Sequence, residues 1–78
     1  MTADERILEG FARNMLNGRD CATIQTSALE RQGYNAATLL EWIAGYEGLP
    51  TTERSFEFRK DFVNLGSRHD FGLVIRRL

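Results

Sequence analysis

Two single residues, Cys21 and His69, have the chemistry of a catalytic nucleophile or general base. Each would need a partner that activates or orients it, and neither has one at a recognisable spacing. His69 stands between Arg68 and Asp70 in a polar stretch that predicts an exposed loop. A lone cysteine is more often a small buried hydrophobic residue than a reactive thiol. We therefore expect that the protein is not an enzyme.

Metal ions and phosphate groups also lack a recognisable set of ligands. One histidine and one cysteine are too few for a zinc site. Glu53, Glu57 and Asp61 are spaced so that only a helix would align them, whereas the residues around them predict a strand. Residues 45–48 contain two glycines but lack the lysine and the strand–loop–helix context of a phosphate-binding loop. We expect no metal and no cofactor.

Length and charge predict a small cytoplasmic domain. The 78 residues carry a net charge of −1, which gives no overall field to attract nucleic acid, and they predict one domain over residues 1–78. The charge is uneven, with −3 over residues 1–48 and +2 over residues 49–78. A single cysteine suits a reducing compartment, and no apolar stretch is long enough to span a bilayer. A chain this short needs an efficient core or a partner subunit that completes it.

Residues 27–48 predict a helix-turn-helix, around which the other elements would be arranged. Its first four residues follow the capping-box pattern, and Gly33 ends the short helix that they begin. Asn35 is a suitable N-cap for a longer helix that Gly48 closes. Trp42 is expected to be buried where the helices meet the C-terminal strands. It belongs to an apolar stripe at helical spacing: Leu39, Trp42, Ile43 and Tyr46.

A first helix is predicted at the N-terminus. Thr2 and Glu5 have the spacing of a capping box, and Asn17 with Gly18 gives a typical helix end. Glu9 lies off the expected apolar face. That face consists of Ile7, Leu8, Phe11, Ala12, Met15 and Leu16.

The segment that follows, residues 19–26, is open to two interpretations. Thr23 and Ile24 favour a short strand, because β-branched residues suit extended structure. Asp20 could instead cap the first turns of a longer helix. We favour the strand.

Residues 55–62 and 71–76 predict a β-hairpin with a loop at residues 64–70. Three phenylalanines alternate with charged residues in the first strand, and the second is apolar and β-branched. One register pairs Phe62 with Phe71, Lys60 with Leu73, Phe58 with Ile75, and Glu57 with Arg76. The aromatic and aliphatic side would then pack on the helices, and Glu57 and Arg76 would form an outward pair of opposite charge.

The resulting fold class is α+β, with three helices including a helix-turn-helix and a C-terminal β-hairpin. This order of elements is that of a winged helix-turn-helix domain. In such a domain residues 35–47 would be the recognition helix and residues 64–70 the tip of the wing. The analogy concerns the fold and says little about function.

The outward face of the longer helix argues against a simple DNA reader. Ala37, Glu41 and Ala44 would face solvent together with Thr38 and Gly45, and none of these carries the cation that phosphate contacts favour. Such small residues let another protein surface approach closely. The basic residues that could contact phosphate lie mainly in the hairpin: Arg59, Lys60, Arg68, His69, Arg76 and Arg77.

We therefore predict a small non-enzymatic binding module, a regulator or inhibitor that acts through protein–protein contacts. Small proteins of this kind are often encoded by phages or mobile elements. The predicted partner-binding residues are Ala37, Glu41, Ala44, Arg59, Arg68, His69 and Arg76. The alternative is a winged-helix transcriptional regulator that binds nucleic acid through its basic hairpin. A homodimer is a further prediction, because the C-terminal strand would offer a free edge to a second copy of the chain.

Overall fold

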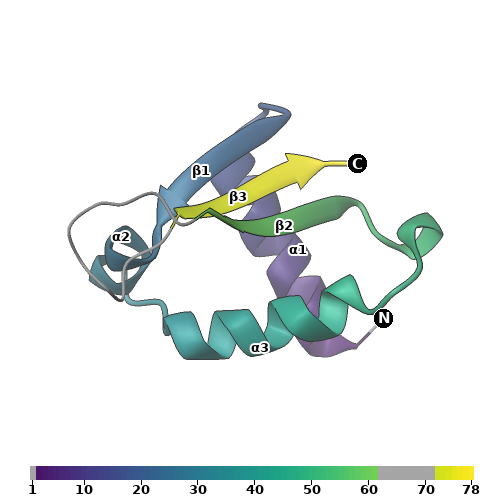
Figure 1. Cartoon of the computed structure of the whole chain (residues 1–78), viewed down its shortest axis with the longest axis horizontal. Helices are drawn as coiled ribbons and strands as arrows, with labels where there is room; N and C mark the ends of the chain where they lie inside the picture. Colours follow the sequence, from purple (N-terminus) through teal and green to yellow (C-terminus); the bar gives the residue numbers. More distant parts are fainter. Residues whose placement is uncertain (1, 62–71) are drawn as a thin grey trace.

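The computed structural model describes residues 2–61 and 72–78 and has the predicted α+β class (Figure 1). The predicted loop at residues 64–70, with Arg68 and His69, and the predicted pairing of Phe62 with Phe71 lie outside the described residues. The described elements are helix α1 (Ala3–Leu16), strand β1 (Cys21–Gln25), helix α2 (Thr26–Arg31), helix α3 (Ala36–Glu47), a short 3-10 helix η1 (Thr51–Glu53), strand β2 (Phe56–Asp61) and strand β3 (Gly72–Arg77).

Helix α1 begins and ends as predicted. The Glu5 amide donates to the Thr2 hydroxyl at 3.3 Å, and the Thr2 amide donates to the Glu5 carboxylate at 2.8 Å, which completes the capping box. Asn17 closes the helix in the left-handed conformation, with φ of 49°, and Gly18 follows with φ of 83°. A positive φ is easiest for glycine, which explains the residue at position 18.

The ambiguous segment is a strand, as favoured, but the capping box predicted for the next helix is wrong. Helix α2 begins at Thr26, two residues earlier than a helix with Ser27 as its N-cap would begin. Gln25 therefore occupies the N-cap position, and its side chain makes no capping hydrogen bond. The pattern at residues 27–30 failed because β1 runs directly into the helix and leaves no separate cap residue.

Helix α3 is capped as predicted, with the Asn35 side chain accepting from the Thr38 amide at 3.1 Å. Its C-cap is Gly48. Leu39, Ile43 and Tyr46 are buried, whereas Trp42 is only partly buried against the core. The expectation of a fully buried Trp42 is therefore wrong, because the indole lies at the margin of the stripe.

The three strands form an antiparallel sheet in the order β1-β3-β2. The predicted hairpin register is confirmed within the described residues: Lys60 pairs with Leu73, Phe58 with Ile75, and Glu57 with Arg76. The expected free edge on the C-terminal strand is wrong, because β3 is the central strand and pairs with β1 on its other side. The edges of the described sheet are β1 and β2.

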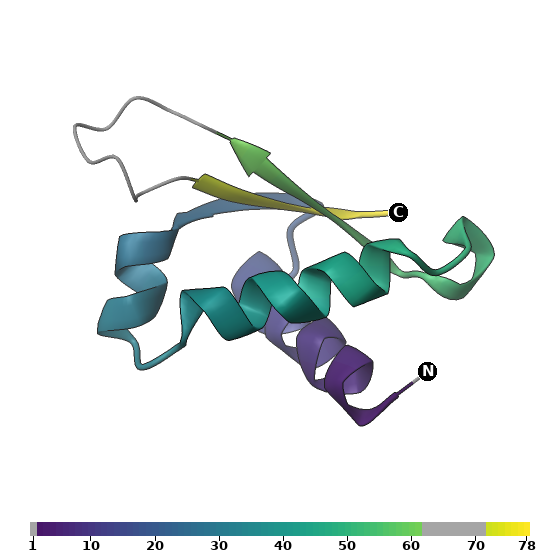
Figure 2. The same ribbon diagram turned by 60° about the horizontal axis from the view of Figure 1, so that its bottom comes forward.

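Helices α1 and α3 cover one face of the sheet, and no described helix lies on its other face, which we call the open face (Figure 2). The aromatic and aliphatic face of the hairpin packs on these helices, as predicted. Two features of α1 differ from expectation, since Ile7 is 55% exposed and Glu9 only 7% exposed. Within residues 2–61 and 72–78, the buried apolar residues are Leu8, Phe11, Ala12, Leu16, Leu29, Leu39, Ile43, Tyr46, Phe56, Phe58, Leu73 and Ile75.

Candidate functional site

The five predicted partner-binding residues that the structure describes divide between two surfaces. Ala37, Glu41 and Ala44 are exposed on the solvent side of α3. Arg59 and Arg76 are exposed on the open face of the sheet. Because α3 packs with its other side toward α1 and the inner face of the sheet, these two groups do not form one site (Figure 2).

On the open face of the sheet, Arg59 and Arg76 occupy neighbouring rows. Arg59 pairs with Val74, and Arg76 pairs with Glu57 on one side and Cys21 on the other. Although Glu57 and Arg76 face each other as predicted, no ion pair joins them among the interactions of the described residues. The guanidinium groups of Arg59 and Arg76 are therefore open to solvent and to a partner.

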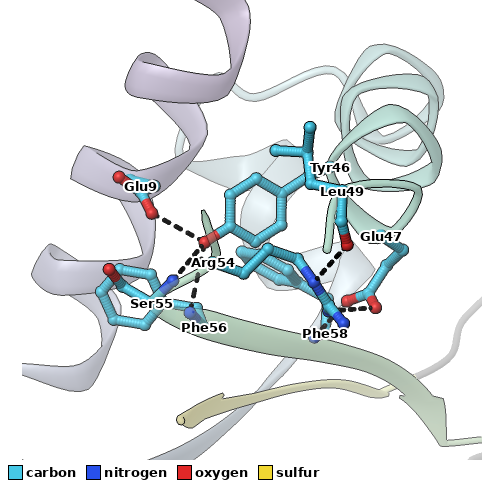
Figure 3. A network of polar contacts seen from close by, with 8 residues as sticks. All are labelled: Glu9, Tyr46, Glu47, Leu49, Arg54, Ser55, Phe56 and Phe58. Atoms are coloured by element: carbon cyan, nitrogen blue, oxygen red, sulfur yellow. Dashed lines mark hydrogen bonds and ion pairs between the residues drawn. The ribbon is translucent and has the colours of Figure 1, made fainter. Parts of the chain in front are cut away.

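The position of α3 is fixed by a buried polar contact that sequence reasoning did not find (Figure 3). The Tyr46 hydroxyl donates to Glu9 Oε2 at 2.7 Å and accepts from the amides of Ser55 at 2.9 Å and Phe56 at 3.2 Å. Arg13 lies 3.7 Å from the other carboxylate oxygen of Glu9. This single hydroxyl joins α1, the end of α3 and the start of β2, and it explains why a glutamate is buried in α1.

A second contact, next to the first, holds the segment between α3 and β2. Glu47 Oε1 accepts from the Phe58 amide at 2.8 Å, and Glu47 Oε2 lies 2.7 Å from Arg54 Nη1. Arg54 Nε also donates to the Leu49 carbonyl at 3.0 Å (Figure 3). Glu47 is thus a structural residue of the turn, and its carboxylate is already engaged at both oxygens.

The buried hydroxyl of Tyr46 has a shifted acidity. Burial raises the pKa of the phenol above its usual value of 10.0, and the hydrogen bond to the Glu9 carboxylate raises it further, whereas the bonds from the Ser55 and Phe56 amides lower it. The folded protein therefore holds this proton more tightly than the unfolded chain does. The stability contributed by this group is complete below the unfolded pKa and is lost as pH rises through the folded pKa.

We expect the free energy of unfolding to fall as pH rises above about 10, and part of that fall to be absent from Tyr46→Phe. The measurement is urea unfolding of both proteins at a series of pH values from neutral to alkaline. Phenylalanine has no proton to lose, so the difference in stability between the two proteins should shrink in this range. A difference that stays constant with pH would contradict this assignment.

Three arginines from separate parts of the chain line one open cleft of about 470 Å³. Arg13 lies with its guanidinium carbon 5.9 Å from the centroid of the Phe56 ring, close enough for a cation–π contact. Arg54 is held by Glu47 and Leu49, and Arg77 has no side-chain partner among the described residues. The lining residues are Arg13, Arg54, Ser55, Phe56, Arg77 and Leu78.

Of these three arginines, only Arg77 was named from the sequence as a residue that could contact phosphate, and the cleft itself was not predicted. Arg13 lies in α1, and nothing near it along the chain indicates that it reaches Phe56. A second, smaller cleft of about 190 Å³ is lined by Arg59, Lys60, Asp61 and Val74. The basic side chains of these two clefts lie in or beside strands β2 and β3, while helix α3 carries no basic residue.

Two further properties concern the whole described part of the chain. Residues 2–61 and 72–78 contain no group of three or more histidine, cysteine, aspartate or glutamate side chains arranged to hold a metal ion. None of the helices in these residues is both long enough and apolar enough to cross a lipid bilayer.

Comparisons with models of known protein families, with curated proteins and with solved structures found no significant match to this chain. Its function is therefore inferred from its own side chains and their arrangement.

Proposed function

We propose that this protein is a small non-enzymatic binding module, a regulator or inhibitor that acts by occupying the surface of a protein partner. The proposal treats the fold as winged-helix-like, with α3 in the place of the recognition helix. The observation that supports it is the solvent side of α3, where Ala37, Glu41, Ala44 and Gly45 are all exposed.

This surface suits a protein partner better than a nucleic acid. Three of its four residues are small, so a partner backbone or side chain can approach the helix closely. Glu41 adds a negative charge that would repel phosphate, and α3 contains no lysine, arginine or histidine from Ala36 to Glu47 to compensate it. Because the contacts of Tyr46 and Glu47 fix α3, the surface is presented without a large ordering cost.

The test is to place a bulky cation on this face. Ala44→Arg should leave the fold stable, because position 44 is exposed and arginine is a good helix former. It should abolish capture of the partner from a lysate of the native host. Asn14→Arg is the matched control, since it adds the same charge at an exposed position of α1 and should capture the partner normally.

The result is read from proteins that the wild type and Asn14→Arg both enrich and Ala44→Arg does not. Equal enrichment by all three proteins would mean that α3 is not the binding surface. Circular dichroism of Ala44→Arg provides the check that loss of binding is not loss of folding.

A second candidate function is a winged-helix transcriptional regulator that binds nucleic acid through its basic strands. The cleft formed by Arg13, Arg54 and Arg77, together with exposed Arg59 and Arg76, favours it. Arginine makes the bidentate contacts that phosphate oxygens accept. One of these five side chains comes from α1, one from the residue directly after η1, one from β2 and two from β3.

Under the preferred proposal we expect no binding to duplex or single-stranded oligonucleotides at low salt, measured by fluorescence anisotropy. The second candidate predicts the opposite result, a binding constant that falls steeply as salt rises. In that case Arg77→Ala and Arg76→Ala should each weaken binding and reduce the salt dependence. Such an outcome would replace the preferred proposal with the second.

A further inference from the structure

The two edges of the sheet differ in how their backbone groups are used. The Leu78 amide donates to the Ser55 carbonyl at 3.0 Å, which fixes the alternation of hydrogen bonds between β2 and β3. Phe56 and Phe58 therefore direct their amides away from β3, toward the outer edge. There the Tyr46 hydroxyl and the Glu47 carboxylate accept from them (Figure 3). The first half of the β2 edge is thus closed by side chains of α3.

The β1 edge has no such cover in the described part of the chain. The Arg77 amide donates to the Asp20 carbonyl at 2.9 Å. Because hydrogen-bonded and non-hydrogen-bonded pairs alternate along an antiparallel ladder, the backbone amides and carbonyls of Ala22 and Ile24 point toward β3. Cys21, Thr23 and Gln25 then direct their amides outward. No group within residues 2–61 and 72–78 accepts from these three amides.

Strand β1 also lacks the features that usually keep an edge from pairing. Its sequence, CATIQ, contains no lysine, no other charge and no proline. Its outward-facing side chains are exposed, and Ala22 and Ile24 are only partly buried against the core. An added strand would therefore satisfy backbone groups and cover apolar surface at the same time.

We propose that β1 is a dimerisation edge at which a second copy of this chain pairs antiparallel to the first. Pairing centred on Thr23 places Thr23 opposite the partner's Thr23, so that two short hydrogen bonds close between the same residues of the two copies. Cys21 then stands opposite Gln25 of the partner subunit. Two three-stranded sheets join into one of six strands, with the helices of both copies on the same side.

A second copy fits this edge because the strand is complementary to itself. In the register centred on Thr23, Ala22 faces Ile24 of the partner subunit on the helix side, so apolar residues meet apolar residues. On the open face threonine meets threonine and cysteine meets glutamine, with no pair of like charges. A core formed by so short a chain also gains from a partner that extends it.

The test uses proline to remove one outward amide. Thr23→Pro deletes an amide that makes no bond to β3, and proline is tolerated at such edge positions, so the monomer should stay folded. Sedimentation velocity over a range of concentrations should show a wild-type dimer. In Thr23→Pro the dissociation constant should rise about tenfold or more. Thr23→Val is the matched control, since it keeps the amide and should still dimerise.

A cross-link tests the register separately from affinity. In Gln25→Cys, oxidation should join Cys21 of one copy to residue 25 of the other and give a covalent dimer, which Cys21→Ser in the same background should prevent. A wild-type protein that stays monomeric at high concentration would overturn the proposal. So would a dimer that Thr23→Pro leaves unchanged. Neither result bears on the binding surface of α3, since purified protein alone is measured.

Discussion

Phe58→Asp should unfold the protein. The Phe58 side chain is 6% exposed and packs edge-on against Tyr46, with ring centroids 5.5 Å apart. Removing such a ring costs about 3–5 kcal/mol, and burying an unpaired carboxylate in its place adds several more. A chain of 78 residues has a total stability of about 4–12 kcal/mol at ~0.05–0.15 kcal/mol per residue. We expect loss of the far-ultraviolet circular dichroism signal of the folded state.

Phe58→Leu is the control for this substitution, because it keeps an apolar side chain on the inner face of β2. It should stay folded with reduced stability, as a smaller group leaves some space beside Tyr46. A Phe58→Asp protein that remained folded but failed to bind its partner would contradict the orientation of the sheet. It would make the phenylalanine face a binding surface.

Tyr46→Phe is expected to reduce the free energy of unfolding by about 2–6 kcal/mol, because two buried groups, the Phe56 amide and Glu9 Oε2, each lose a partner at a cost of about 1–3 kcal/mol. The ring remains, so the effect isolates the hydroxyl. Without it the Ser55 and Phe56 amides lose their acceptor, and Glu9 Oε2 loses its donor in a buried site. Urea unfolding of the two proteins at neutral pH measures the difference.

The contribution of Glu9 can be separated by a double-mutant cycle with Glu9→Gln. If the two side chains act through their direct hydrogen bond, the double variant should lose less stability than the sum of the two single losses. Strict additivity would mean that the hydroxyl acts only on the amides of β2. A Tyr46→Phe protein as stable as the wild type would contradict the role given to the whole network.

The hairpin register could be predicted because its determinants are close together in the sequence. Alternating phenylalanines and charges define one buried face, and a shift of one residue would expose Phe58 and Ile75. The caps of α1 and α3 could be predicted for the same reason, since Thr2 and Asn35 each bond an amide three residues away.

Other features depend on contacts between distant residues and could not be predicted. The Glu9 carboxylate can be buried because the Tyr46 hydroxyl donates a hydrogen bond to it, and Tyr46 lies 37 positions later in the sequence. Periodicity places Glu9 off the apolar face and gives no sign of that partner. The strand order could not be predicted for the same reason, because the pairing of β1 with β3 joins segments that are separated by most of the chain.

The candidate site shows the same limit. The exposure of Ala37, Glu41 and Ala44 followed from the helical period of α3, which is a local property. The arginine cleft did not follow, since Arg13 meets Phe56 only after α1 packs on the sheet. Sequence reasoning could therefore identify a helix face but not a cleft formed by three distant segments of the chain.

Site-specific photocrosslinking from α3 tests the central proposal most directly. A photoreactive amino acid would replace Ala44, or Asn14 as a control, in protein expressed in the native host. Binding of a protein through α3 predicts a discrete adduct from position 44 that survives nuclease, is destroyed by protease, and is missing from position 14. An adduct to nucleic acid, or no adduct from position 44 while the protein is folded, would contradict the proposal.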